Sequence, residues 1–509
     1  MTAQFCIIFA IIIYLLMMIL IGINYSKKNS NVSDFYLGGR KLGPLVTAMS
    51  AEASDMSSWL LMGLPGVAYL SGIADASWTA IGLAVGTYIN WLVVAKRIRL
   101  YSQATGSFTL PDFFSKRYGD DKNLLTCVSA IIIVIFFIPY TASGFAACGK
   151  LFGTLFGTNY QLAMILSAII IVIYCTMGGF LAVSTTDLIQ SITMTIALFV
   201  VILFGTSVAG GTDAVIANAK ELPGYLSMFQ MHNAAEGTAS PYSFLTICST
   251  MAWGLGYFGM PHILLRFMAI EDEKKLKISR RIASVWVVIS MTVAILIGLI
   301  GYSISKAGAI PMLEGSGQAE TIIVRIADLL SSHGVIPALI AGVILAGILA
   351  ATMSTADSQL LAAASSISQN LLQDFFKIKI SEKASIRIAR GTVIAISAIA
   401  VVLANNPDSS VFQIVSFAWA GFGAAFGPVV LLALFWKRSN KWGALAGMIA
   451  GGSMIFIWKY GIARLGGAFK IYELLPAFIF ALIVNVVVSL ATAAPSKEVT
   501  DVFETYLEQ

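Results

Sequence analysis

Long apolar stretches separated by short polar loops run along almost the whole chain. A helix needs about 20 mostly apolar residues to cross the hydrocarbon core of a bilayer. Thirteen stretches meet this length, at 5–24, 44–70, 74–95, 124–149, 161–180, 187–209, 241–265, 283–305, 334–361, 388–404, 411–436, 442–460 and 473–493. The pattern therefore predicts an all-α integral membrane protein with about 13 transmembrane helices.

These spans are expected to form a single transmembrane domain over residues 1–509. Its core would cover about 44–436, after a first helix at 5–24 and before two last helices within 442–493 and a short cytoplasmic tail at 495–509. The apolar run at 5–24 is long for the core of a signal peptide and has no small-residue cleavage pattern after it, so we expect it to be retained.

Composition points to lipid as the natural solvent of most of the chain. Hydrophobic residues make up 58% and charged residues only 11%, and the mean hydropathy is +0.85. The net charge of +6 does not by itself indicate nucleic acid, because cytoplasmic loops of membrane proteins collect Lys and Arg. Most of the 32 Lys and Arg residues, Lys27 and Lys28 among them, fall inside if the N-terminus is outside and the C-terminus cytoplasmic.

The cysteines and histidines indicate neither a disulfide framework nor a zinc site. The five cysteines lie in apolar stretches and form no C-x-x-C pair, and the three histidines are widely scattered. Ser/His/Asp groupings of the kind used in nucleophilic catalysis are not evident, and no loop is long enough for a soluble catalytic or signalling domain. We therefore expect a membrane protein that is not an enzyme.

The second span is unusually polar for a helix in lipid. It reads SAEASDMSSWLLMGLPG from Ser50, with Glu52 and Asp55 followed by a Gly/Pro-rich stretch. Charged residues within spans are costly and usually functional. One interpretation is a continuous helix that lines a polar interior, with Asp55 simply hydrogen-bonded. The other is a broken helix, because irregular backbone at membrane depth is tolerated where it lines a cavity.

The seventh span is also interrupted, by WGLGYFGMP from Trp253 to Pro261. Close packing of helices through small residues would explain the glycines but not the proline. Trp253 and Tyr257 are one turn apart and share a face. Broken helices at corresponding positions of two halves indicate an inverted-repeat transporter, here with repeats at spans two to six and seven to eleven.

The ninth span carries a polar face near its end, in AATMSTADSQLL. Ser354, Asp357 and Ser358 lie at positions i, i+3 and i+4, and Thr355 lies beside them. Hydroxyl and carboxylate oxygens are ligands for hard cations, a rule that we extend from calcium and magnesium to sodium. Ser and Thr also bond back to their own helix, which would explain the hydroxyls but not Asp357. Asp187 is either a second acidic ligand or a helix N-cap.

Five stretches resemble the sodium/solute symporter family, and the resemblance extends over almost the whole chain. They are GGRKLGP from Gly38, ASDMSSWLLMGLPG from Ala53, WGLGYFGMPHI from Trp253, MSTADSQLL from Met353 and AWAGFGAAFGPVVL from Ala418. The resemblance implies a leucine-transporter-like fold and residue roles that follow the family's motifs.

The implied sodium ligands are carbonyl groups of Ala53, Met56 and Ala351 and hydroxyl groups of Ser354 and Thr355. Asp55 matches a carboxylate needed for sodium, through direct or indirect contact. The positions that match residues near the solute are Ser57, Tyr140, Trp253, Tyr257 and Pro261. Arg40 matches an arginine linked to the transport cycle. Some family members bind a second sodium ion, for which the candidates are Asp187, Ser354, Asp357 and Ser358, with a salt link from Asp357 to a nearby cation as the alternative.

The resemblance implies sodium-coupled uptake of L-proline by alternating access across a bacterial plasma membrane. Neither nucleic acid nor an obligate protein partner is expected, and the partners are the solute, sodium ions and lipid. The nearest alternative is another small solute, such as another amino acid, pantothenate or a monocarboxylate. Proton coupling through Asp55 or Asp357 and a membrane sensor also remain open, whereas a channel is disfavoured because no filter sequence is evident.

Overall fold

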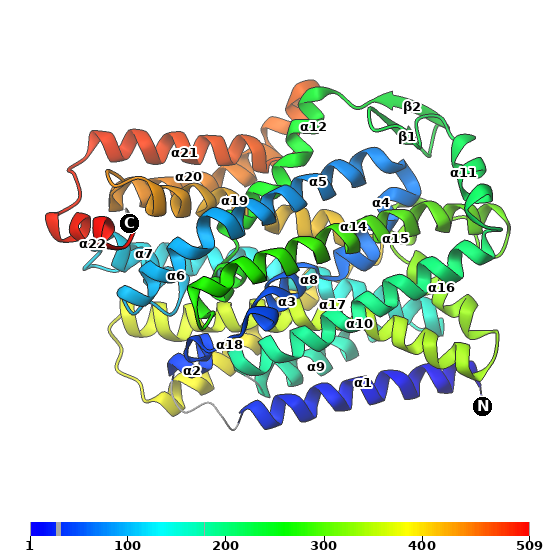
Figure 1. Ribbon diagram of the computed structural model, residues 1–509, viewed down its shortest axis with the longest axis horizontal. Coiled ribbons are helices and arrows are strands. Elements are labelled where there is room, and N and C mark those ends of the chain that lie inside the picture. Colours follow the sequence, from blue (N-terminus) through cyan, green and yellow to red (C-terminus); the bar gives the residue numbers. More distant parts are fainter. Residues whose placement is uncertain (1, 27–31, 178, 508–509) are drawn as a thin grey trace.

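The computed structural model describes residues 2–26, 32–177 and 179–507, so Lys27 and Lys28 lie outside the described residues. The long helices run side by side along the longest axis of the molecule, with the chain's two ends at opposite ends of the bundle (Figure 1). We refer to these as the N-terminal end and the C-terminal end of the bundle.

Ten helices among the described residues are long and apolar enough to cross a membrane. They are α1 (Ala3–Ser26), α5 (Ile73–Ile89) continued through the π-turn Asn90–Val94 into α6 (Ala95–Ala104), α8 (Leu124–Phe156), α10 (Phe180–Val208), α14 (Leu276–Lys306), α17 (Val335–Ser365) with the π-segment Ser366–Phe375, α18 (Glu382–Leu403), α19 (Val411–Phe435), α20 (Lys441–Tyr460) and α21 (Leu474–Ala491).

The other three expected spans are short or interrupted. Span five is α9 (Tyr160–Met177). Span two is α3 (Pro44–Asp55), the π-turn Trp59–Gly63 and α4 (Leu64–Ser71). Span seven is α12 (Phe244–Met251), the 3-10 segment Ala252–Gly259 and α13 (Pro261–Ala269). The helical membrane architecture is as predicted, and the count of thirteen spans stays a prediction.

Short elements cover the two ends of the bundle (Figure 1). The C-terminal end carries α2 (Val32–Leu37), α7 (Leu110–Tyr118) and α22 (Lys497–Leu507), and the N-terminal end carries α11 (Thr212–Lys220), α15 (Gly315–Ala319), α16 (Ile322–Ser331) and the antiparallel hairpin of β1 (Gln230–Asn233) and β2 (Thr238–Pro241). The remaining 3-10 turns are Gly38–Arg40, Glu273–Lys275, Ile462–Leu465 and Gly467–Lys470.

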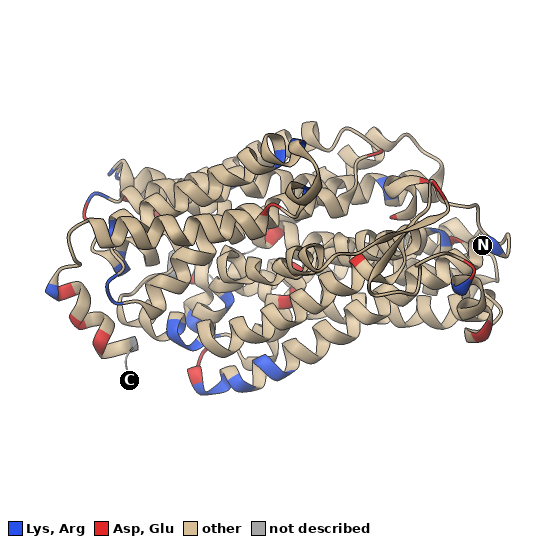
Figure 2. Ribbon diagram, turned by 90° about the horizontal axis from the view of Figure 1, so that it is seen from above, with Lys and Arg blue, Asp and Glu red and all other residues tan. Residues whose placement is uncertain are grey.

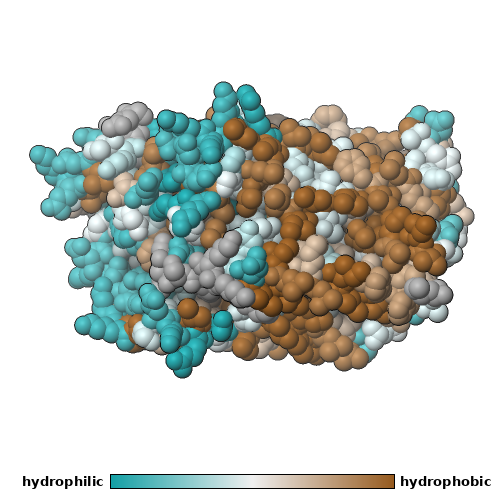
Figure 3. Space-filling model, turned by 60° about the horizontal axis from the view of Figure 1, so that its bottom comes forward, coloured by the Kyte–Doolittle hydropathy of each residue, from teal (hydrophilic) through white to brown (hydrophobic). Residues whose placement is uncertain are grey.

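A broad apolar surface surrounds the middle of the bundle. Leu203 on α10 is 72% exposed and Val402 on α18 is 73% exposed, far more than such side chains tolerate in water over a large area. Figure 3 shows this surface in brown beside a polar, teal end. Figure 2 shows that charged residues lie mostly at the two ends. This distribution fits a bundle whose flanks face lipid.

A buried ion pair at the N-terminal end of the bundle joins Lys150 of α8 to Glu320, which lies between α15 and α16. Lys150 Nζ lies 2.6 Å from Glu320 Oε2, and both side chains are almost fully buried. The Glu320 carboxylate also accepts hydrogen bonds from the Ser410 hydroxyl (2.7 Å) and from the backbone N–H groups of Val411 (3.0 Å) and Phe412 (3.1 Å). Glu320 therefore fixes the first turn of α19.

We expect Lys150→Met to lower the free energy of unfolding by about 3–5 kcal/mol, because breaking a buried pair leaves an uncompensated charge. The matched control is Lys306→Met, which breaks the exposed pair between Lys306 and Glu221 and should change the stability by about 0–1 kcal/mol. Thermal unfolding of the two purified variants in detergent measures the difference. Equal stabilities would contradict this account of the ion pair.

Candidate ion and solute site

Span two is broken between Asp55 and Trp59. α3 ends at Asp55, and Met56 has φ −72° and ψ 70°, outside the helical region. The Asp55 carbonyl, freed from the helix, accepts hydrogen bonds from the Trp59 indole N–H (3.0 Å) and the Tyr140 hydroxyl (3.2 Å). Pro65 further weakens the helix, because proline has no N–H to donate to the preceding turn. The broken helix expected from the sequence is therefore present.

Span seven is broken at Met260, which has φ −75° and ψ 110°, and α13 starts at Pro261. Proline is favoured at the first position of a helix, where its missing N–H has no intrahelical partner anyway. The glycines before it serve close packing. A Cβ on Gly254 would lie 2.2 Å from the Gly82 carbonyl oxygen, and one on Gly256 would lie 1.9 Å from Trp419 Nε1. The glycines are therefore explained by packing, and the proline by the break.

The first break meets α17 at a cluster of oxygen atoms. The Ser354 hydroxyl donates to the Ala53 carbonyl oxygen at 2.8 Å, and it lies 3.2 Å from the carbonyl oxygen of Ala351. Thr355 Oγ1 is buried and has no hydrogen-bond partner among the described residues. Met56 lies in the break itself and is buried. Neutral oxygen atoms, one of them unbonded, fit the ligand chemistry of a hard monovalent cation.

The two breaks are joined through Asp55. The Tyr257 hydroxyl donates to Asp55 Oδ2 at 2.6 Å, while Oδ1 is buried and has no hydrogen-bond partner among the described residues. The Tyr140 hydroxyl approaches the Asp55 carbonyl from α8, and Ser57 Oγ lies 3.4 Å from the backbone nitrogen of Trp59. Carboxylate, hydroxyl and backbone groups from spans two, four and seven thus lie together at the centre of the bundle.

An aromatic cluster lies beside the breaks. The ring of Trp253 lies 6.0 Å from that of Trp59, 5.2 Å from that of Phe412 and 5.3 Å from that of Tyr472. The Trp419 indole donates to the Trp253 carbonyl at 2.7 Å, and its ring meets the Tyr257 ring edge-on at 5.1 Å. The sequence assigned roles to Trp253 and Tyr257 but not to the residues of α19 or to Tyr472, which precedes α21, although Trp419 lies within one of the quoted motifs.

A second polar cluster lies one turn from the first, around Arg266 of α13. Asp187 Oδ2 accepts from the Arg266 guanidinium (3.1 Å) and from the Ser50 hydroxyl (2.6 Å). Ser358 Oγ accepts from the same guanidinium at 2.6 Å, and Asp357 Oδ1 lies 3.4 Å from Ser358 Oγ. The sequence missed this arginine, because an arginine near the end of a span reads as a loop charge that reaches toward water.

The interpretation of Asp187 as an N-cap is wrong. Its helix begins at Phe180, with Gly179 before it in an extended conformation, so Asp187 lies two turns inside α10. The predicted start of span six at residue 187 is also wrong, because the helix already begins at Phe180. The stretch FLAVSTT, which looked like part of a turn, is compatible with a helix because its hydroxyls bond back to carbonyls of the preceding turn. Asp187 is therefore a buried side chain of the helix interior.

Arg40 lies away from these clusters, at the C-terminal end of the bundle. Its guanidinium donates to the carbonyl groups of Ser102 (2.9 Å), Ser107 (2.5 Å) and Met268 (2.6 Å). Burial and the nearby charge of Arg99 lower the pKa of Arg40 to about 10, so it stays charged at neutral pH. Arg40 therefore ties the segment before α3 to the ends of α6 and α13.

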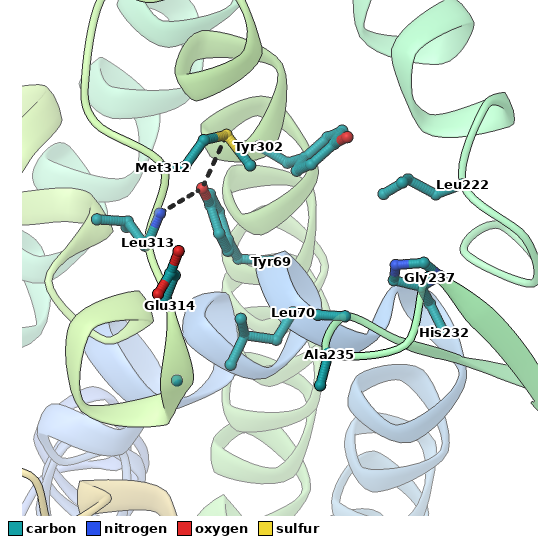
Figure 4. Close-up of a pocket in the computed structure, with 12 residues that line it drawn as sticks. Tyr69, Leu70, Leu222, His232, Ala235, Gly237, Tyr302, Met312, Leu313 and Glu314 are labelled. Atoms are coloured by element: carbon teal, nitrogen blue, oxygen red, sulfur yellow. Dashed lines mark hydrogen bonds between the residues drawn. The ribbon is translucent and has the colours of Figure 1, made fainter.

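A cavity of about 660 Å³ lies at the N-terminal end of the bundle, beside the end of α4. Tyr69 and Tyr302 form part of its wall, with His232 and Ala235 of the hairpin region across from them (Figure 4). The Tyr69 hydroxyl is held by the backbone N–H of Leu313 (3.1 Å). The second half of broken span two, α4, therefore borders this cavity.

Comparisons with known proteins agree with this architecture. The family model described as "Sodium:solute symporter family" matches residues 35–451. The chain is 42% identical to the osmoregulated proline transporter OpuE of Bacillus subtilis, over 96% of each chain. It is 43% identical to the high-affinity proline transporter PutP of the same organism, over 96% of this chain and 99% of the relative. It is 41% identical to the sodium/proline symporter of Escherichia coli, over 95% and 93%.

Two solved structures share the fold at low sequence identity. A sodium-coupled sialic acid symporter in a substrate-bound, outward-open state superimposes with a TM-score of 0.77 at 18% identity, over 97% of this chain and 99% of that one. Mhp1, a nucleobase-cation-symport-1 family transporter in a closed conformation, gives 0.57 at 14% identity, over 94% and 99%. The chain therefore shares the fold of these two proteins, and the leucine-transporter-like prediction is confirmed. The chain belongs to the sodium:solute symporter family.

Proposed function

We propose that this protein takes up L-proline together with sodium by alternating access. The observation that carries the proposal is the oxygen cluster at Ala53, Ala351, Ser354 and Thr355, which lies beside a broken helix and an aromatic cluster. Relatives at 41–43% identity over nearly the full chain are named as proline transporters. No residue of the site suggests covalent chemistry, so we infer a carrier rather than an enzyme.

Sodium is the co-transported ion in this proposal. It would be held by the carbonyl oxygens of Ala53, Met56 and Ala351 and the hydroxyl oxygens of Ser354 and Thr355. The Ser354 hydroxyl, which donates to Ala53 in this structure, would turn its proton away so that both oxygens present lone pairs to the ion. Bound sodium would then link α3 to α17 directly. Asp55 directly precedes Met56 in the chain and supplies the negative charge.

Proline would bind at the break, where polar and aromatic groups meet. Helix N-termini favour negative charge, so the half-helices that begin after each break suit the carboxylate of a zwitterion. Tyr140, Trp253 and Tyr257 offer ring faces or edges for the pyrrolidine ring, and Ser57 offers a hydroxyl group. Pro261 acts by fixing the start of α13. The membrane potential contributes about 2.3 kcal/mol per charge per 100 mV to the driving force for uptake, which corresponds to roughly a 50-fold concentration gradient of the solute.

In the same proposal the chain works as one transport unit over residues 1–509 in a bacterial plasma membrane. The N-terminal end of the bundle faces outside, and the end with most Lys and Arg faces the cytoplasm. The cavity beside Tyr69 then lies on the outer side, where solute enters. Lipid, sodium and the solute are its partners, and no protein partner is required.

Uptake of radiolabelled proline into proteoliposomes tests the function. We expect accumulation with an inward sodium gradient and none when potassium replaces sodium. A panel of competing solutes, with other amino acids, pantothenate and short monocarboxylates, tests the substrate. Sodium-driven uptake of one of these solutes without proline uptake would support sodium coupling and show that proline is not the substrate. Transport of no solute by a folded protein would favour a sensor.

Arg40→Ala should lower the maximal rate of proline uptake by about tenfold or more, because three carbonyl groups at the cytoplasmic end lose a charged hydrogen-bond donor. The half-saturating concentration of proline should change little, since Arg40 is remote from the break. The matched control is Lys41→Ala, which removes the neighbouring exposed charge. The measurement is the initial rate of proline uptake by the two variants, normalised to the amount of protein in the membrane. Equal rates would contradict this role of Arg40.

A further inference from the structure

Arg266 is a fully buried arginine that joins four helices. It lies in α13 and is 1% exposed. Its guanidinium donates to Ser50 Oγ of α3 (3.0 Å), Ser358 Oγ of α17 (2.6 Å), Asp187 Oδ2 of α10 (3.1 Å) and the carbonyl of His262 in its own helix (2.9 Å). A buried arginine with this many partners fixes the relative positions of the elements that carry them.

Two of these contacts lie one turn from the candidate sodium ligands. Ser50 precedes Ala53 by one turn of α3, and Ser358 follows Ser354 by one turn of α17. Ser358 also donates to the carbonyl of Ser354 at 2.9 Å. The same two helices bring the Ala53 carbonyl and the Ser354 hydroxyl within 2.8 Å of each other. The guanidinium therefore links these helices one turn nearer the C-terminal end of the bundle.

We propose that Arg266 is a positioning residue that sets the affinity of the sodium site without touching the ion. This proposal rests on the proposed function. A site built from oxygens of two separate helices binds a hard cation only while the helices keep a fixed separation. The planar fork of the guanidinium reaches Ser50 and Ser358 at once and holds that separation, which the single ammonium group of a lysine does not.

Charge neutralisation makes this arrangement compatible with sodium binding nearby. A lone guanidinium one turn from the ion would repel it, and Asp187 compensates the charge through the buried pair with Arg266. The guanidinium also occupies the space between Asp187 and Ser358, where the sequence had suggested a second ion. Arg266 therefore acts there as a tethered cation, and we expect one sodium ion per solute with a hyperbolic dependence of uptake on sodium.

Sodium binding to purified protein tests the inference, because it needs no transport. We expect Arg266→Gln and Arg266→Lys to raise the half-saturating sodium concentration about tenfold or more, since each loses charge-assisted hydrogen bonds to the ligand helices. The half-saturating proline concentration at saturating sodium should change less than about threefold in proteoliposomes, because Arg266 does not face the solute. Arg281→Gln, which removes an exposed arginine of α14, is the matched control.

A merely structural arginine would reduce the number of sodium sites per protein and leave the half-saturating concentration unchanged, and this result would overturn the proposal. If Arg266 variants do not fold, Ser50→Ala and Ser358→Ala remove the acceptors one at a time. Each single variant should raise the half-saturating sodium concentration. Because both serines contact the same guanidinium, the double variant should raise it by a factor different from the product of the two single factors. A factor equal to that product would also overturn the proposal. Absence of sodium binding to the parent protein would instead refute the proposed function.

Discussion

Replacing Ser354 and Thr355 together by alanine should abolish sodium-driven proline uptake, raising the half-saturating sodium concentration by at least about 100-fold. The double variant removes both hydroxyl ligands and leaves only carbonyl groups, so a dehydrated cation would lose much of its coordination shell. The two hydroxyls are small, and the helix tolerates alanine well, so the protein should remain folded. Sodium titration of initial uptake rates measures the effect.

The control for this variant is Thr352→Ala in the same helix. Thr352 is buried, and its hydroxyl bonds back to the carbonyl of Ile348 at 3.0 Å, away from the oxygen cluster. Its loss should leave the half-saturating sodium concentration within about threefold of the parent value, because such back-bonds contribute little to a helix. An equal effect of Thr352→Ala and of the double variant would mean that the hydroxyls serve the helix and not the ion.

Asp55→Asn should reduce sodium-dependent uptake by at least about 100-fold. The substitution keeps the shape of the side chain and a hydrogen-bond acceptor for the Tyr257 hydroxyl, but it removes the negative charge beside the break in span two. Two opposite charges about 4 Å apart attract by about 4 kcal/mol at an effective dielectric constant of 20, so even part of this attraction is a large change in sodium affinity.

The control for Asp55→Asn is Glu52→Gln on the same helix. Glu52 is equally buried, but its carboxylate accepts from the Trp91 indole (3.0 Å) and the Thr87 hydroxyl (3.1 Å) on the side of α5 and the π-turn after it. We expect Glu52→Gln to retain sodium-dependent uptake with a half-saturating sodium concentration close to that of the parent. If Asp55→Asn transports normally, the carboxylate is not part of the ion site.

The sequence was sufficient to predict the breaks and the polar face of span nine, because local composition determines both. A proline after a run of glycines cannot continue a helix, and the serines and the carboxylate of span two have no place against lipid. The same logic placed Ser354 and Thr355 on a polar face of span nine. Helical periodicity placed Ser354, Asp357 and Ser358 on one face with Thr355 beside it, and the structure places the Ser354 hydroxyl against the Ala53 carbonyl.

Long-range partners could not be predicted in this way. Trp419 fits into the space left by Gly256, and nothing local to either residue indicates the other. Arg266 was counted as a loop charge, although its guanidinium lies at Asp187, because the sequence does not show whether a side chain near a helix end turns toward water or inward. The N-cap alternative for Asp187 failed because the start of α10 was placed at the first carboxylate rather than after the glycine pair.

The link between the two ligand helices gives sodium a structural role in the transport cycle. Sodium that joins the Ala53 carbonyl to the Ser354 hydroxyl would hold α3, the first half of a broken span, against α17. Loss of the ion would remove this link between α3 and α17, whereas the contacts of Ser50 in α3 with Arg266 and Asp187 would remain. Sodium affinity and opening toward the cytoplasm are therefore expected to change together in variants of this region.

Sodium flux driven by proline tests most directly whether sodium and proline move as one coupled unit. Proteoliposomes would be prepared with equal sodium on both sides and clamped at zero membrane potential, and a proline gradient would be applied from outside. We expect radioactive sodium to enter against its own gradient as the gradient forms, and this entry to be absent with Ser354 and Thr355 replaced by alanine. Proline entry without accompanying sodium entry would contradict the account.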